Sequence, residues 1–417
     1  MSSSSNATAA NGIEALNALV TSTLDLITRL ETVVASLSAE NARDNTTTST
    51  TTTNSEEESN AHPEINPLSL ASDASSLIRA HCTKLSLLII NEPFTPSAIS
   101  SILRQLTSGP LPGLASAAQI CAHPSSPWTA TISADLGYRI SRVLRETRSL
   151  VEKVPKDGKA LKEPPAGKGQ RAGARGTGKQ GSVVNTGMLW AACDEVVGFA
   201  KRGFGGNLVR KCEEMRDTVR DVAEELKEWG EETGSDEEDE EDEDDDEDEE
   251  EDDGEEDKDV KDVTQSLEAA KIADTQAMLD DLMNSSNNYI PRDDPDKIRE
   301  RLESCLRRLR LVTLLYTAVA KRRFKSLPAQ PVQPTESKSD IPKRLDEIMV
   351  LLKKIPERFG SLALAFYELD PVEIDRLMDQ CFFDCFAVAE LLIKPWDGEK
   401  DEFSEWLVKF QAEIKKA

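Results

Sequence analysis

The sequence predicts an all-α protein made of two antiparallel helical bundles of long amphipathic helices. Apolar residues recur at three- and four-residue spacing through most of the chain, which is the period of a helix that buries one face. No segment alternates apolar and polar residues between hairpin turns, as half-buried strands do. Five polar segments interrupt the helical pattern, and the most acidic of them lies between its two halves. The bundles are therefore expected on either side of that acidic segment.

An N-terminal helix is expected within residues 12–40, after an unpatterned start at residues 1–11. Only Thr23 interrupts its apolar seam, and the pattern stops at a low-complexity linker rich in Thr, Ser and Glu, residues 41–66. Such polar segments bury too little apolar surface to offset the entropy lost on ordering, so residues 1–11 and 41–66 are expected to be disordered. The long linker leaves the helix able to dock on either bundle.

The N-terminal bundle is expected over residues 67–229. Thr95-Pro96 and Ser126-Pro127 predict helix starts in it, because a Thr or Ser N-cap followed by proline suits the unpaired N–H groups of a first turn. A basic Gly-rich insert, residues 153–184, interrupts the bundle and is expected to be disordered. After this insert, residues 186–201 are predicted to form a helix that is apolar on more than one side, and Gly203, Gly205 and Gly206 are predicted to break it.

The acidic segment, residues 231–257, holds 23 of the 77 acidic side chains and no basic one. The full chain has a formal net charge of −27, whereas the remainder has 54 acidic and 50 basic side chains and is nearly neutral. Residues 230–262 are therefore expected to form a disordered spacer that separates the bundles by self-repulsion. Two other roles stay open: the segment binds histones or other basic proteins, or it covers a basic element of the same chain.

The C-terminal bundle is expected over residues 263–325 and 340–417, with a Pro/Gln/Ser linker at residues 326–339. Asp294-Pro295 and Asp370-Pro371 predict two of its helix starts by the same cap-and-proline rule.

The composition argues against a membrane-spanning or secreted protein. No stretch approaches the roughly 18 consecutive apolar residues that span a bilayer, and the N-terminus has no apolar core of a secretion signal. Seven scattered cysteines fit a reducing compartment. The three histidines are isolated, and Cys381 and Cys385 lack further ligands nearby, so no metal, cofactor or small-molecule substrate is expected. Because no nucleophile or phosphate-binding motif stands in a folded context, the chain is predicted not to be an enzyme.

Three features point to a family. The first is ASSLIRAHCTKLSLLIINEPFTPSAISSILRQL, residues 74–106, and the second is GMLWAACDEV, residues 187–196. The third is the order of parts, an acidic insert between two helical halves, of which the second ends near DEFSEWLVKF. Together these features resemble the cyclin-D-binding protein family, also called Grap- and cyclin-D-interacting (GCIP) or maternal Id-like proteins. Candidate core positions in the first two segments are Leu85, Leu88, Ile89, Ile102, Leu106, Trp190 and Cys193.

The resemblance implies a non-enzymatic helical adaptor of the nucleus and cytoplasm. Such a protein acts on the cell cycle and on transcription through contacts with a cyclin-like protein or a transcription regulator. It also implies a leucine-zipper-like coiled coil, but the seam over residues 298–319 has leucine only at Leu302 and Leu309, and the oligomeric state stays open. The residues alone are also compatible with an acidic-tract chaperone for histones or other basic proteins, and with a vinculin-like cytoskeletal helical bundle.

Three further expectations concern individual sites. Trp190 is expected in the core, where replacement by Ala would cost about 3–5 kcal/mol, whereas an exposed Trp190 would become an interface candidate. Ser55 and Ser235 precede acidic residues as substrates of acidophilic kinases do, so we expect both to be phosphorylated. Four cations end the predicted helix at 295–325 and resemble a nuclear-import signal, although they also complement the helix macrodipole. These cations are Lys321, Arg322, Arg323 and Lys325.

Overall fold

The computed structural model describes residues 2–44, 65–124, 126–161, 182–231, 289–328, 330–331, 341–396 and 401–416. Over these residues the chain is helical and contains no strand, which confirms the predicted fold class. The chain divides into two compact units. Unit 1 consists of Met1–Lys211 and Ala320–Met349, and unit 2 of Cys212–Val319 and Val350–Ala417. Each unit thus takes residues from both sides of the acidic segment, whereas the sequence predicted one bundle on each side.

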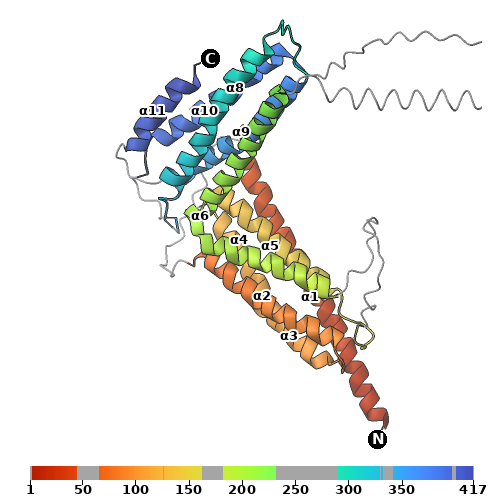
Figure 1. Ribbon diagram of the computed structural model, residues 1–417. Coiled ribbons are helices and arrows are strands. Elements are labelled where there is room, and N and C mark those ends of the chain that lie inside the picture. The colour runs from red at the N-terminus through yellow and green to blue at the C-terminus, as the bar shows by residue number, and fades with distance from the viewer. Residues whose placement is uncertain are drawn as a thin grey trace, which may run out of the picture. The chain divides into compact units, whose positions relative to one another are not determined.

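Unit 1 is a bundle in which α1 packs against α3, α4 and α5, and α2 against the same three helices (Figure 1). The first part of α6 completes it, together with a π-helical turn, η1, and the start of α9. The bounds are α1 Ser2–Asp44, α2 Pro67–Ile90, α3 Pro96–Ser108, α4 Pro110–Ala122, α5 Ala130–Val151, α6 Ser182–Glu231, η1 Ala320–Phe324 and α9 Ile341–Tyr367.

Helix α1 belongs to unit 1, which decides a question that the sequence left open. It is longer than expected, because the helix begins at Ser2 and ends at Asp44. Thr23 is fully buried in its apolar seam, and its hydroxyl donates to the carbonyl of Leu19 at 2.8 Å. Arg148 of α5 donates to the Thr28 hydroxyl at 3.1 Å and pairs with the Glu31 carboxylate. Helix α1 is therefore held in unit 1 by its buried apolar seam and by the contacts of Arg148 with Thr28 and Glu31.

Two predicted helix starts in unit 1 have different outcomes. Helix α3 begins at Pro96 as predicted, although the Thr95 hydroxyl caps no N–H and donates to the Pro93 carbonyl at 3.1 Å. The predicted start at Ser126-Pro127 is wrong, because α5 begins at Ala130 with Thr129 as its N-cap. A carboxylate distant in the sequence, Asp346 of α9, accepts from the Ala130 N–H at 2.8 Å and the Thr131 N–H at 3.2 Å. The first turn of α5 therefore has a local cap, Thr129, and a distant acceptor, Asp346.

The basic insert at 153–184 is ordered at both ends, so the expectation of disorder fails there. Val154 is buried, and the Leu161 N–H donates to the Ile89 carbonyl at 2.8 Å. The carbonyl of Lys156 accepts from the Asn17 side-chain amide at 3.2 Å. Helix α6 begins at Ser182, inside the predicted insert. The rest of the insert lies outside the described residues.

The predicted break is confirmed at Gly203, but not at Gly205 and Gly206, which lie inside the helix. Gly203 has φ 67° and ψ −170°, a backbone region that glycine enters readily, and α6 bends there. The Asn207 amide donates to the carbonyls of Phe199 at 2.8 Å and Gly203 at 2.7 Å, so carbonyl groups freed at the bend keep hydrogen-bond partners.

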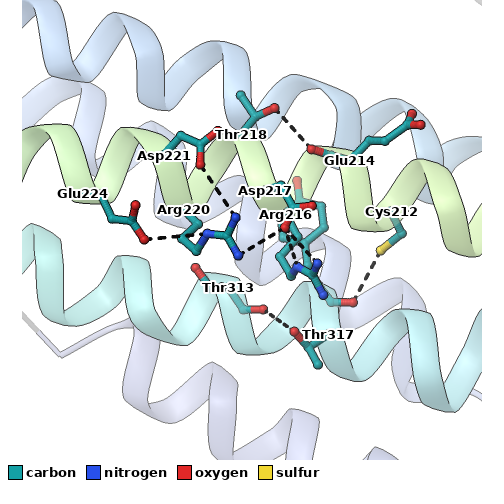
Figure 2. A network of polar contacts seen from close by, with 11 residues as sticks. Cys212, Glu214, Arg216, Asp217, Thr218, Arg220, Asp221, Glu224, Thr313 and Thr317 are labelled. Atoms are coloured by element: carbon teal, nitrogen blue, oxygen red, sulfur yellow. Dashed lines mark hydrogen bonds and ion pairs between the residues drawn. The ribbon is translucent and has the colours of Figure 1, made fainter.

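Unit 2 combines the second part of α6 and most of α9 with α8 Ile298–Val319, α10 Pro371–Ile393 and α11 Glu402–Ile414. Its core surrounds Tyr316, which is fully buried and donates its hydroxyl to the Leu352 carbonyl at 2.6 Å. The Cys212 thiol lies 3.4 Å from the Tyr316 carbonyl and donates to it, joining α6 to α8 (Figure 2). The Tyr316 hydroxyl and the Cys212 thiol thus both have hydrogen-bond partners inside this core.

The two predicted helix starts of unit 2 also differ. Helix α10 begins at Pro371, and the Asp370 carboxylate accepts from the N–H groups of the next turn, as predicted. Helix α8 begins three residues later than Pro295, at Ile298. The Asp294 carboxylate accepts from the N–H of Ile298 at 2.7 Å, while Lys297 has a positive φ of 54° that ends the preceding turn.

The charged side chains of α6 in unit 2 form hydrogen bonds and ion pairs with one another along the helix (Figure 2). The Arg216 guanidinium donates to Asp217 at 2.8 Å, and Arg220 lies 3.5 to 3.8 Å from Asp217, Asp221 and Glu224. Ion pairs this exposed contribute little to stability, so burial of the opposite face is what holds this part of α6 in place.

Candidate partner-binding surface on helices α2 and α6

The two sequence segments that suggested a family, residues 74–106 and 187–196, lie on elements that pack together in unit 1. Three buried hydroxyls join α2 to α6. Thr186 donates to the Ser86 hydroxyl at 2.9 Å, and the hydroxyls of Ser86 and Ser182 are 3.2 Å apart. Because an unpaired hydroxyl is costly inside a core, this chain of bonds favours one register between the helices.

Most of the candidate core positions lie inside unit 1. Ile102 is 7% exposed, and Leu88 is only half-buried. Burial raises the pKa of the Cys193 thiol to about 12, so this cysteine is an apolar packing group and not a nucleophile. The fully buried members of the set are Leu85, Ile89, Leu106 and Cys193.

Trp190 is not a core residue, and the expectation that it is buried is wrong. Its side chain is 38% exposed, and its indole N–H donates to the Thr83 hydroxyl of α2 at 2.9 Å. The core-facing positions of α6 are Leu189, Cys193 and Val196, at the three- and four-residue spacing of a buried face. Trp190 follows Leu189 by one residue, and this rotates it about 100° around the helix, out of the core.

Trp190 belongs to an exposed apolar face at the start of α6. Val183 and Val184 are 54% and 49% exposed, and Met188 is 38% exposed. Across the helix pair, Leu87 of α2 is 52% exposed. The apolar face comprises Leu87, Val183, Val184, Met188 and Trp190. Several exposed large apolar side chains on two helices that pack together are unusual on a soluble domain and typical of a protein-interaction site.

Ion pairs border this apolar face where α6 continues. Asp194 pairs with Arg79 of α2 at 3.4 Å, and Glu195 pairs with Arg142 of α5. The Arg79 guanidinium also lies 5.3 Å from the centre of the Trp190 ring, which holds the indole against α2. An apolar centre with a charged border is the usual anatomy of a protein–protein interface.

Val183, Val184, Met188 and Leu87 were not among the predicted site residues. Val183 and Val184 fell within the predicted linker, so they were assigned no role. One signal was available: the helix predicted at 186–201 has apolar residues on more than one side, although a single bundle contact covers only one. An additional apolar side therefore had to be exposed or to face a further helix.

The four predicted import cations are not on one surface. Lys321, Arg322 and Lys325 are exposed, but Arg323 is only 2% exposed. The apolar seam of α8 reaches Val319, and Arg323 is the next position of that seam, four residues on. The four residues also form a π-helical turn and its exit, in place of the expected α-helical end.

Other predicted sites are separate from the apolar face. Cys381 and Cys385 are buried in unit 2, and no group of three or more potential metal ligands occurs among the described residues. Ser55, Ser235 and residues 232–257 lie outside the described part of the chain. Within that part, none of the helices combines the length and the apolar character needed to cross a membrane.

The fold and this apolar face define an all-α protein with a surface suited to protein contacts. The family model described as "Grap2 and cyclin-D-interacting, N-terminal" matches residues 71–232. The resemblance noted from residues 74–106 and 187–196 is therefore confirmed for this segment, which contains the whole apolar face. None of the curated proteins searched matches the chain significantly.

Proposed function

We propose that this protein is a non-enzymatic adaptor that binds a partner protein through the apolar face of α2 and α6. The supporting observation is that Trp190, Leu87 and Val183 are all exposed within the segment that matches a family named for its protein interactions. By that resemblance the partner is a cyclin-like protein or a transcription regulator, and the process is control of the cell cycle and of transcription.

The geometry suits a partner that presents an amphipathic helix. The α6 residues of the apolar face extend over about two turns, from Val183 to Trp190, which matches the spacing of apolar anchors on a docking helix. Gly187 lies in the middle of this face, and a Cβ atom there would have no neighbour within 4 Å. A partner side chain therefore has room between Val183 and Trp190. Trp190 is the expected anchor, because tryptophan in such a setting contributes much of the binding free energy.

Binding of the purified full-length chain to a purified D-type cyclin, measured by isothermal titration calorimetry, tests this proposal. Trp190→Ala should raise the dissociation constant about thirtyfold, which corresponds to a loss of roughly 2 kcal/mol of binding free energy. The matched control is Tyr138→Ala on α5, which removes another aromatic ring that is 66% exposed and lies off the apolar face. This control should leave the dissociation constant within about twofold.

Two results would contradict the proposal. One is that neither Trp190→Ala nor Met188→Asp changes the dissociation constant. The other is retained affinity for the cyclin when circular dichroism shows that a variant has lost its helices. Deletion of residues 231–257 separates a rival function, because a histone chaperone would lose binding to basic proteins while the adaptor keeps its partner.

We further propose that the protein works in the nucleus and the cytoplasm, with import through the exposed cations after α8. Changing Lys321 and Arg322 to Ala should reduce nuclear enrichment of the full chain, and an unaltered distribution would exclude these cations as the import signal. Phosphorylation at Ser55 and Ser235 is a separate proposal from their acidic surroundings. Mass spectrometry of the native protein that finds both serines unmodified would refute it.

A further inference from the structure

Trp190 is exposed, yet contacts from α2 hold its side chain at two points. Its indole N–H donates to the Thr83 hydroxyl at 2.9 Å, and the Arg79 guanidinium lies 5.3 Å from the centre of its ring. The aliphatic side chains of the apolar face, such as Leu87 and Val183, have no polar atom that could be held in this way. The largest side chain of the face is therefore also the one that polar contacts restrain.

The Thr83 hydroxyl is suited to this contact because its own proton is already used. Thr83 donates to the Arg79 carbonyl, one helical turn earlier in α2, at 2.6 Å. The hydroxyl oxygen is left as an acceptor, and an indole N–H can only donate. The two hydrogen bonds are thus compatible, and together they connect the Trp190 ring to the backbone of α2.

Asp194 holds the second contact in place. Its carboxylate is 3.4 Å from the Arg79 Nε atom, and Asp194 follows Trp190 by four residues, so both side chains lie along the same side of α6. The Arg79 guanidinium therefore has an aromatic ring and a carboxylate as neighbours, and both attract a cation.

These exposed contacts contribute little to holding α2 and α6 together. The side chains of Arg79 and Asp194 are 46% and 60% exposed, and ion pairs at such exposure add little to stability. The register of the two helices is already favoured by the buried hydroxyls between them. The exposed contacts mainly restrict the Trp190 side chain.

A restrained side chain is an advantage at the centre of a binding surface. A side chain that becomes ordered only on binding loses conformational entropy at that moment, and this loss opposes association. A tryptophan that is already held in the free protein avoids part of the loss. The same contacts with a partner then give a lower dissociation constant.

We propose that Thr83, Arg79 and Asp194 are positioning residues, which hold Trp190 in its binding orientation before a partner arrives. This inference rests on the proposed function of the apolar face. Thr83 is the most informative member to change, because Thr83→Val removes the hydroxyl and leaves the shape of the side chain almost unaltered.

The first measurement uses the free full-length chain. Its five tryptophans give five indole N–H signals, and the signal that is lost in Trp190→Phe belongs to Trp190. In the parent chain the nitrogen-15 order parameter of this group should be close to that of a rigid backbone, about 0.85, and in Thr83→Val it should fall below about 0.6. Thr83→Ser keeps a hydroxyl and should restore the parent value.

The second measurement is calorimetric titration of the same variants with a purified D-type cyclin. Thr83→Val should raise the dissociation constant about three- to tenfold, less than Trp190→Ala does, because the ring itself is still present. The double variant Thr83→Val/Asp194→Asn should raise it further, since the Arg79 guanidinium then loses its carboxylate. Thr83→Ser should stay within about twofold of the parent chain.

Thr218→Val is the matched control. Thr218 is exposed on α6 in unit 2 and also donates to a carbonyl one helical turn earlier, at 3.2 Å. Its replacement removes the same kind of hydrogen bond away from the apolar face. Both the Trp190 order parameter and the dissociation constant should therefore remain those of the parent chain.

Three results would overturn the positioning role. The first is an equal indole order parameter in the parent chain and in Thr83→Val. The second is a dissociation constant that Trp190→Ala raises and Thr83→Val does not, which would leave the proposed function intact. The third is a dissociation constant that Trp190→Ala leaves unchanged, because the proposed function then fails and there is no anchor to position.

Discussion

Two glycines of helix α6 provide a test of how closely the turn after η1 packs against this helix. Gly187 and Gly205 both lie inside α6 with helical backbone. A Cβ atom on Gly187 would meet nothing within 4 Å, whereas one on Gly205 would be 2.8 Å from the Phe324 carbonyl oxygen and 3.0 Å from the Leu327 carbonyl oxygen. We therefore compare Gly187→Ala with Gly205→Ala.

The magnitudes follow from two opposing effects. Alanine is more favourable than glycine in a helix interior by roughly 0.5–1 kcal/mol, so Gly187→Ala should raise the free energy of unfolding by about that amount. Gly205→Ala has the same gain, but its methyl group meets two backbone oxygens that no side-chain rotation can move. Overpacking of this kind costs about 1–3 kcal/mol. In the difference between the unfolding free energies of the two variants the helix preference cancels, so only the steric cost at Gly205 remains.

Urea unfolding followed by far-UV circular dichroism measures that difference, provided that both variants share one dependence on denaturant concentration. Gly187→Ala should have a higher midpoint than the parent chain and Gly205→Ala a lower one. Equal midpoints for the two variants, or a higher one for Gly205→Ala, would refute the close approach of the turn after η1 to α6.

Two other predictions follow from buried ionisable groups. Every cysteine is buried, and burial raises the pKa of Cys121 and Cys193 to about 12. A thiol reagent at pH 8 should therefore leave the native chain unlabelled and label all seven cysteines in urea. Rapid labelling of the native chain would contradict the packing. Burial also raises the pKa of Asp346, so the folded chain binds this proton more tightly and the Asp346 contribution to stability increases as pH falls through that pKa. Asp346→Asn should remove this pH dependence, and Asp346→Ala should lower the free energy of unfolding by about 1–2 kcal/mol at neutral pH, because the hydrogen bonds to α5 are lost. Urea unfolding at several pH values measures both effects. An unchanged pH profile in Asp346→Asn would show that another group titrates.

The helices were predictable from the sequence wherever their signals are local. Helix α10 begins at Pro371 as predicted, and Asp370 caps it from the adjacent position. The seam of α8 is buried from Ile298 to Val319, as its spacing indicates. A start set by a distant group was not predictable, because the Asp346 carboxylate that stabilises the first turn of α5 is 216 residues away from Ala130.

The candidate site was predictable only in part, for the same reason. Residues 74–106 and 187–196 indicated the right pair of helices, and most of the aliphatic core positions lie inside. The orientation of α6 was not predictable, because a helix with apolar residues on several sides can bury any one of them. The hydroxyls of Ser86, Ser182 and Thr186 help to set which side is inside, and Trp190 consequently lies at the surface.

The sequence by itself determined the all-α class, the helical seams and the concentration of negative charge in residues 231–257, since periodicity and composition are properties of the chain alone. Tertiary structure decided that α1 joins unit 1, that Arg323 is buried, and that the apolar residues at the start of α6 are exposed. These outcomes depend on which neighbours compete for each helix face. That competition is settled by contacts between residues far apart in the chain, which no local pattern contains.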